Sequence, residues 1–472
     1  MFRKFIWILL EKGSITILNF GTLIILSRLL SPSDYGVYGI MVLFISITET
    51  LIDSGFGGAI VQKKDLQQVD INTLFFFNLA ISIFAYIVLF VVAPFIENIY
   101  KIENLSLYFR TIGITLVLYA LSLIQISLLN RKLLFRKSAV INVTSYSLAS
   151  AIAITMAYFG WGIWSLIWQL ILSSCFLAVF YWCTNRIRIT FDVSVKSFTY
   201  MWKFGINTVW ANITQTVVNN LMTSIIPKIS TAAQAGYYFQ ANRVNSAPNA
   251  ILIQCIDKGI FPILSKEANE ANIIEKARSM NRFFLSIITP LFPLFSITAY
   301  PIVMILLGEK WENSVVYLSI LAWSGIALCI QAVYRNIIKS TGKTKYIFYV
   351  EIIKSMITLT VLFISMKFGV LFMVYGFTIS AFIGIFVWSY VLAYKFAYSF
   401  INQLRDLIKP LLASVLMILL IKVINIDCTS CYSLTVLPLG YFLYWIVSLF
   451  MKNKEIQIIT EKFLDSIYRK KN

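Results

Sequence analysis

The chain has 472 residues, of which 59% are hydrophobic, with a mean hydropathy of +0.80 and a formal net charge of +19. A soluble domain is about 45–50% apolar, so this composition excludes a soluble multidomain protein and indicates a polytopic membrane protein. The chain contains no histidine, which excludes imidazole catalysis, histidine proton relays and histidine-ligated metals. In a membrane protein the positive charge indicates basic cytoplasmic loops rather than nucleic-acid binding.

Apolar blocks of about 20 residues, the length that crosses a bilayer core, follow one another along the chain. The N-terminal block is interrupted at Glu11 and has no small-residue cleavage site, so we interpret it as an uncleaved first helix. The blocks predict fourteen transmembrane spans, at 12–31, 36–58, 71–93, 107–129, 139–159, 162–182, 205–226, 235–263, 283–306, 315–338, 346–366, 370–394, 407–425 and 433–451.

The predicted fold is therefore an all-α polytopic bundle, with six spans before the segment 185–204 and six after it. This spacing predicts an N-terminal lobe over 1–184 and a C-terminal lobe over 205–395, because many transporters are built from such repeats. Two extra spans over 407–451 and a basic tail over 452–472 complete the chain.

The distribution of Lys and Arg predicts the orientation. If the N-terminus is cytoplasmic, 30 of the 40 basic residues fall in inside segments and seven fall outside or at outer helix ends. This asymmetry predicts that both termini are cytoplasmic. The outside loops are too short to form a catalytic domain. The tail can form an amphipathic helix on the anionic inner leaflet, or it can bind a specific partner.

The seventh span carries a polar face, whose members are spaced three or four residues apart and so lie on one side of a helix. They are Asn212, Gln215, Asn219 and Thr223, extended by Thr208 and Thr216. Lipid would not tolerate this face. It is predicted to line a water-filled cavity, with hydrogen bonding between helices as the alternative.

The eighth span holds Arg243 among polar residues that include Gln240 and Asn245. An arginine in the middle of a span needs an anionic partner, a cage of carbonyls or an aqueous chamber. Pro248 removes one backbone donor and can free carbonyl groups. We favour an aqueous chamber with a transient anionic partner, and the alternative is a fixed ion pair.

Four smaller charge patterns are also predicted to matter. Arg28 stands near the end of the first span, where it either snorkels to the outer interface or borders an internal chamber. Lys354 follows Glu351 by three residues, so an ion pair on one helix face is the alternative to a free cation. Glu49 and Asp53 share one face of the second span and can balance a cation or carry a coupling proton. Asp257 is expected to pair with its neighbour Lys258.

Several chemistries are excluded or weak. There is no GxxxxGK[ST] phosphate loop, no HExxH motif and no Cys/His cluster, so neither an ATP-driven engine nor a metal site is expected. No cofactor is predicted beyond H⁺ or Na⁺ coupling. The spacing of Cys428 and Cys431 fits either a small disulfide in an outer loop or two unpaired thiols. The Gly55–Gly58 run is interpreted as a helix end or close packing.

Several segments together resemble the bacterial polysaccharide flippases, the Wzx-type exporters of the multidrug/oligosaccharidyl-lipid/polysaccharide superfamily. The branch they resemble most is the colanic-acid and teichuronic-acid export type. The resemblance covers roughly residues 15–345 and is carried by SRLLSPSDYGVYGI, DSGFGGAIVQKKDLQQVDINTLFFFNL, NRKLLFRKSAVINV, YFGWGIWSLIWQ and AGYYFQANRVNSAPNAI. One departure is Asn219-Asn220, where that branch often has an aspartate, which puts a carboxylate-coupled step at that position in doubt.

The resemblance implies two six-helix lobes around a central cavity that opens alternately to either side of the bacterial inner membrane. It implies an oligosaccharide on a polyprenyl diphosphate as substrate, membrane lipids as surroundings, and a polysaccharide polymerase and chain-length regulator as partners. Arginine binds a diphosphate well through bidentate geometry, so Arg243, Arg28 and Lys354, in that order, are the predicted cationic anchors. The polar residues of spans seven and eight would meet sugar hydroxyls.

Three other functions compete with this interpretation. A drug or cation exporter of the same superfamily should have an acidic or aromatic lumen, whereas the charges predicted inside this one are cationic. A membrane polysaccharide polymerase or ligase should carry a large external loop, and no such loop is predicted. A scaffold of a synthesis complex would have little use for a polar face along a span.

Overall fold

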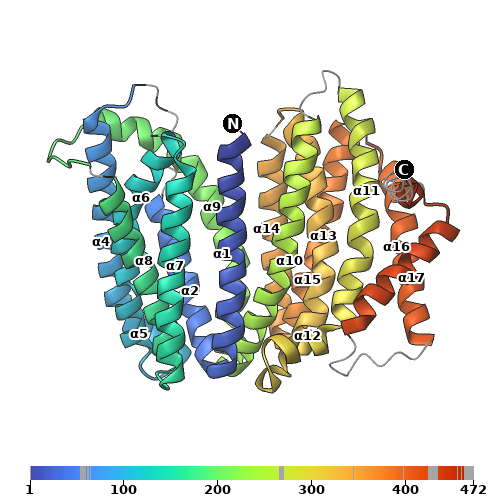
Figure 1. The fold of residues 1–472 in the computed structure, drawn as a ribbon, viewed down its shortest axis with the longest axis horizontal. Helices are drawn as coiled ribbons and strands as arrows, with labels where there is room; N and C mark the ends of the chain where they lie inside the picture. The colour runs from blue at the N-terminus through green and yellow to red at the C-terminus, as the bar shows by residue number, and fades with distance from the viewer. Residues whose placement is uncertain are drawn as a thin grey trace, which may run out of the picture. The chain divides into compact units, whose positions relative to one another are not determined.

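A computed structural model gives the structure of the chain. It describes residues 2–53, 60, 63, 65–185, 187–264, 270–343, 345–396, 398–423, 434–453, 455–458 and 460–461. Within these ranges every regular element is a helix (Figure 1). Cys428 and Cys431, the Gly55–Gly58 run and most of the predicted tail helix fall outside the described residues.

The chain divides into two compact units, Met1–Phe239 and Gln240–Asn472. The helices of the first unit are α1 (Phe2–Leu29), α2 (Pro32–Asp53), α4 (Gln68–Tyr100), α5 (Leu105–Ile112), α6 (Ile114–Arg131), α7 (Phe135–Tyr158), α8 (Ile163–Thr184) and α9 (Val195–Ile229). The boundary falls inside α10 (Ala232–Leu264), whose first turns belong to the first unit.

The second unit holds the rest of α10 and the remaining helices. These are α11 (Glu270–Ile297), α12 (Ala299–Leu306), η1 (Glu309–Trp311), α13 (Ser314–Ser340), α14 (Lys345–Ser365), η2 (Met366–Phe368), α15 (Val370–Lys395), α16 (Phe400–Val423) and α17 (Val436–Phe450). Its core surrounds α13, which packs against α11 and α15. The helices α16 and α17 pack on each other and on α11 (Figure 1).

In the first unit, α7 packs against α1 and α8, and α4 packs against α6 (Figure 1). Helix α9 begins within the segment 185–204, at Val195, and it packs against α2 and α4 in this first unit. The contacts of α9 are therefore with the helices of the predicted N-terminal lobe. The division into lobes at 184 and 205 stays a prediction.

Nine helical stretches of the described chain are long and apolar enough to cross a membrane. They correspond to nine of the predicted spans, and α1, α9, α10, α16 and α17 correspond to the other five. The all-helical, polytopic fold class predicted from the sequence is confirmed.

Several boundaries differ from the prediction, and α9 begins at Val195 instead of at 205. The fourth span is divided at Gly113, where an added Cβ would lie 2.7 Å from the ring of Tyr86, so close packing of α4 requires a glycine at this position. The ninth span ends at Ile297 and resumes as α12 after Thr298. Residues 270–282, predicted as part of an inner loop, form the first turns of α11.

Candidate functional site

The turn between α1 and α2 is closed by a capping box. The backbone N–H of Ser31 donates to the Asp34 carboxylate at 2.9 Å, and the backbone N–H of Asp34 donates to the Ser31 hydroxyl at 3.2 Å. Pro32 fills the first helical position, where its missing N–H costs nothing. Arg28 lies just before this turn, and its side chain is exposed. The turn therefore fixes the end of α1 at which Arg28 is held.

Helix α2 and the start of α10 cross at two glycines. A Cβ on Gly36 would overlap the carbonyl oxygen of Ala232, and a Cβ on Gly236 would overlap the carbonyl oxygen of Pro32. Each contact repeats the other with the helices exchanged. Glycine is required at both positions because the two backbones touch there.

The polar face of α9 is described in part. The side chains of Asn212, Gln215 and Asn219 lie outside the described set. Thr223 is buried, and its methyl group occupies the space beside Gly39 of α2. Thr216 approaches Thr50 of α2, with 3.3 Å between the two hydroxyl oxygens. The described part of this face thus packs against α2, as the alternative of hydrogen bonding between helices predicts.

Two carboxylates project from the second half of α2. Glu49 and Asp53 are half-buried and lie one turn apart. Among the described residues neither carboxylate has a hydrogen-bond or ion-pair partner. Two half-buried carboxylates without a neutralising partner can accept a proton or a small cation.

Arg243 of α10 lies in the second unit and is half-buried. In the described part of the chain no acidic side chain pairs with it. The fixed ion pair considered from the sequence is therefore not found among these residues. The guanidinium keeps five donors available for an anion.

Two amides flank Arg243 along the helix. Gln240 is fully buried, and both atoms of its amide have no hydrogen-bond partner among the described residues. Asn245 is also buried, and its amide nitrogen donates to the backbone carbonyl of Leu321 in α13 at 3.2 Å. Buried polar groups are normally paired, so the Gln240 amide marks a place suited to water or a polar ligand. Asn245 instead fixes α10 to α13.

Lys354 has a partner on its own helix. Its ammonium lies 3.0 Å from the Glu351 carboxylate and 6.0 Å from the ring centroid of Trp388. The ion pair that was the alternative to a free cation is thus present in α14. The interaction of Lys354 with an anionic substrate would have to compete with this pair.

Asp257 has partners on another helix. Its carboxylate accepts hydrogen bonds from the Asn336 amide at 2.6 Å and from Arg335 at 3.3 Å, both on α13. Tertiary packing, rather than sequence adjacency, supplies these partners.

Two polar networks were not predicted. In the first unit the Glu11 carboxylate of α1 accepts a hydrogen bond from the side-chain amide nitrogen of Asn142 in α7. The Tyr181 hydroxyl donates to the side-chain amide oxygen of Asn142 at 3.0 Å. The only sequence signal was the interruption of the first apolar block at Glu11. This network joins α1, α7 and α8.

The second network is in the second unit and centres on Asp406, which is 3% exposed. Arg278 and Arg282 of α11 lie 3.1 Å from its carboxylate, and the Tyr398 hydroxyl donates to it at 2.7 Å. Burial raises the pKa of Tyr398, so this phenol remains a donor. Arg282 also pairs with Glu455 beyond α17.

Polar and cationic side chains inside membrane-length helices are typical of a transport protein, where they line a pathway for the cargo. The fold and these helices together define a polytopic helical membrane protein. The family model described as polysaccharide biosynthesis protein matches residues 25–316. The chain belongs to this family of polysaccharide biosynthesis proteins, as the sequence resemblance predicted.

Two curated relatives and one solved structure illustrate the similarity. The succinoglycan biosynthesis transport protein ExoT of Rhizobium meliloti is 24% identical over 354 residues, which cover 75% of this chain and 72% of ExoT. The lipopolysaccharide biosynthesis protein WzxC of Escherichia coli is 22% identical over 309 residues, covering 64% of this chain and 62% of WzxC. The lipid II flippase MurJ, in an inward closed conformation, has a TM-score of 0.78 at 14% identity, covering 96% of this chain and 100% of MurJ.

Proposed function

We propose that the protein is a flippase that moves oligosaccharide repeat units linked to polyprenyl diphosphate across the bacterial cytoplasmic membrane. The units would pass from the inner to the outer leaflet by alternating access, for synthesis of a surface polysaccharide. Membership of the family, the transport function in the name of ExoT and the MurJ-like fold support this transport function. None of these proteins is named as an enzyme of bond formation, and the protein is a transporter rather than an enzyme.

The observation that carries the proposal is that two polar side chains of α10 lack partners among the described residues. Arg243 has no acidic partner among the described residues, and the buried amide of Gln240 has no hydrogen-bond partner there. A diphosphate is a strong anion that a guanidinium binds bidentately. We therefore assign Arg243 as the principal diphosphate anchor, with Gln240 as a donor to phosphate or sugar oxygens.

The other cationic residues have lesser roles in this proposal. Arg28 is exposed at the end of α1, which suits a second anchor at the edge of the pathway. Lys354 is held by Glu351, so it ranks last among the three. Asn212, Gln215 and Asn219 remain proposed contacts for sugar hydroxyls. Asn245, which bonds to α13, and Thr223, which packs on α2, are the weakest of that group.

The energy source belongs to the proposal as well. Glu49 and Asp53 have no neutralising partner in the described part of α2's surroundings, which suits the binding of H⁺ or Na⁺. No other cofactor is proposed. Both termini would be cytoplasmic, and a polysaccharide polymerase and chain-length regulator would use the exported unit.

The test is deletion of the gene in its host, followed by measurement of lipid-linked oligosaccharide in each leaflet and of surface polysaccharide. We expect the lipid-linked unit to accumulate in the inner leaflet and wild type to reverse this. Arg243→Ala should fail to complement at normal protein abundance, whereas Arg243→Lys should complement in part. Arg405→Ala, which removes an exposed arginine elsewhere in the second unit, is the matched control.

Three outcomes would reject the proposal. If the unit reaches the outer leaflet normally and only chain length changes, a polymerase or scaffold role replaces it. If deletion alters only resistance to small cationic compounds, the protein is a small-molecule exporter. If Arg405→Ala fails like Arg243→Ala, the effect is not specific to the anchor.

A further inference from the structure

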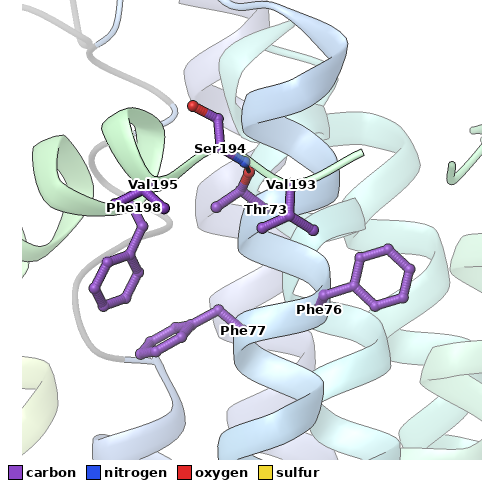
Figure 2. Close-up of a pocket in the computed structure, with 7 residues that line it drawn as sticks. All are labelled: Thr73, Phe76, Phe77, Val193, Ser194, Val195 and Phe198. Carbon is purple, nitrogen blue, oxygen red and sulfur yellow. Dashed lines mark hydrogen bonds between the residues drawn. The ribbon is translucent and has the colours of Figure 1, made fainter. Parts of the chain in front are cut away.

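An apolar hollow of about 390 Å³ lies at the start of α4, in the first unit. One wall is α4, and the other is the segment that leads into α9 (Figure 2). The residues that line it are Thr73, Phe76, Phe77, Val193, Ser194, Val195 and Phe198. None of them belongs to the proposed transport site.

The two walls are tied together by hydrogen bonds across more than 100 residues of sequence. The Asn72 amide donates to the Thr190 hydroxyl at 2.6 Å, and the Ser194 backbone N–H donates to the Thr73 hydroxyl at 3.0 Å. The Gln68 amide donates to the carbonyl of Arg188 at 2.7 Å. These bonds fix the two walls of the hollow to each other.

Aromatic rings line and border the hollow. Phe77 lies 4.7 Å from Phe198, and Phe76 stacks on Phe191 at 4.9 Å, both between ring centroids. Phenylalanine rings carry no polar group and offer a large apolar surface for contact with hydrocarbon. An alkyl chain fits between them better than a polar molecule because the lining offers almost no hydrogen-bonding atoms.

The rim of the hollow exposes large apolar side chains. Phe191 is 94% exposed and Val195 is 80% exposed. Exposure of this extent to water would be unfavourable. Under the orientation proposed above, the segment 185–204 lies at the inner membrane surface, where lipid would cover these side chains.

The same segment is basic. Residues 185–204 contain four Lys and Arg and one acidic residue, Asp192. Of these, Arg188 and Lys196 flank the lining residues and are exposed. Basic residues at the cytoplasmic end of membrane helices attract anionic lipid headgroups.

We propose that the hollow binds one anionic phospholipid of the inner leaflet. An acyl chain would lie between α4 and the segment 193–198, and the phosphate headgroup would meet Arg188 and Lys196. The occupant is a resident lipid rather than the transported substrate, because Arg28 is at the opposite end of the first unit's spans. This lipid would fix the entry of α9, whose first turn forms the wall.

The test is native mass spectrometry of the full-length protein, purified in detergent and mixed with equal amounts of phosphatidylglycerol and phosphatidylcholine. We expect wild type to retain phosphatidylglycerol in preference. Each basic residue at an anionic surface strengthens binding about fivefold. The double variant Arg188→Gln/Lys196→Gln should therefore retain phosphatidylglycerol between about fivefold and thirtyfold less well.

A second variant tests the hollow itself. Val195 is the first residue of α9, and an acidic residue in the first turn is favourable for a helix. Val195→Glu should therefore fold, yet it should lose phosphatidylglycerol because it places a negative charge on the lining. The control Lys367→Gln/Lys395→Gln removes two exposed charges in the second unit and should bind as wild type does.

Equal retention of the two lipids by wild type would overturn the proposal. So would a loss of phosphatidylglycerol from the control variant as large as the loss from Arg188→Gln/Lys196→Gln. If undecaprenyl phosphate at equal concentration displaces phosphatidylglycerol from wild type, the hollow belongs to a polyprenyl chain and the proposed occupant is wrong. Because the readout is bound lipid, failure of the flippase proposal would leave this result unaffected.

Discussion

At the scale of single residues, Gly36 is the position where one added carbon should have the largest effect. Gly36→Ala places a methyl group on the carbonyl oxygen of Ala232, so α2 and α10 must separate. Overpacking of this kind costs about 1–3 kcal/mol. We expect a lower midpoint of thermal unfolding in detergent and weaker complementation of transport.

The matched control is Gly13→Ala in α1, because an added Cβ there meets nothing within 4 Å. Without a clash, alanine favours a helix by about 1 kcal/mol over glycine. This variant should be as stable as wild type or slightly more stable. Equal destabilisation at both positions would mean that helix propensity or expression, and not the crossing, explains the effect.

The pair Glu351 and Lys354 allows the two roles of Lys354 to be separated. Lys354→Glu should impair transport because it places two carboxylates one turn apart. The exchanged variant Glu351→Lys/Lys354→Glu should recover most of the transport if the pair is structural. Complementation of the deletion strain measures both. Failure of the exchanged variant at normal abundance would instead show that transport needs a cation at position 354, as expected of a substrate anchor.

At the scale of helices, Asp406 connects α16 to α11. Removing one partner of a buried ion pair costs about 3–5 kcal/mol. Here Arg278 and Arg282 keep 29% and 35% of their side chains exposed, so solvent reduces the cost. We expect Asp406→Asn to destabilise the protein by about 1–3 kcal/mol, measured by thermal unfolding.

The same variant should also loosen α16 and α17, because Arg282 links Asp406 to Glu455 beyond α17. Limited proteolysis should cut the chain near 397–399 faster than in wild type. Glu312→Gln, which changes an exposed carboxylate in the turn before α13, should alter neither measurement. Unchanged proteolysis in Asp406→Asn would show that packing of α16 and α17 alone holds them.

At the scale of the whole molecule, the chain's own cysteines can test the orientation. Cys183 is exposed at the end of α8, next to the predicted inner segment 185–204, whereas Cys428 belongs to a predicted outer loop. In variants that keep one cysteine each, a membrane-impermeant maleimide should label Cys428 in intact spheroplasts. It should label Cys183 only after permeabilisation. The reverse pattern would mean that the termini face outward.

The membrane fold could be predicted from the sequence because apolar length alone identifies a span, and every predicted span has a helix in the structure. Tertiary partners could not be predicted in this way. Asp257 bonds to Asn336, 79 residues away, and Arg278 bonds to Asp406, 128 residues away. Arg243 was identifiable because an arginine within a span is rare. The hollow beside α4 required two distant segments to meet and left no local signal.

The crossing of α2 and α10 has a consequence for the origin of the chain. Gly36 and Gly236 are 200 residues apart. A Cβ added to either one would overlap a backbone carbonyl oxygen of the other helix. A contact in which residue i meets j and j meets i defines the interface of a two-fold symmetric dimer. Tyr38 and Tyr238 repeat the same spacing after each glycine. A half-length ancestor that paired with a second copy of itself, and whose gene was later duplicated and fused, would leave this pattern within one polypeptide.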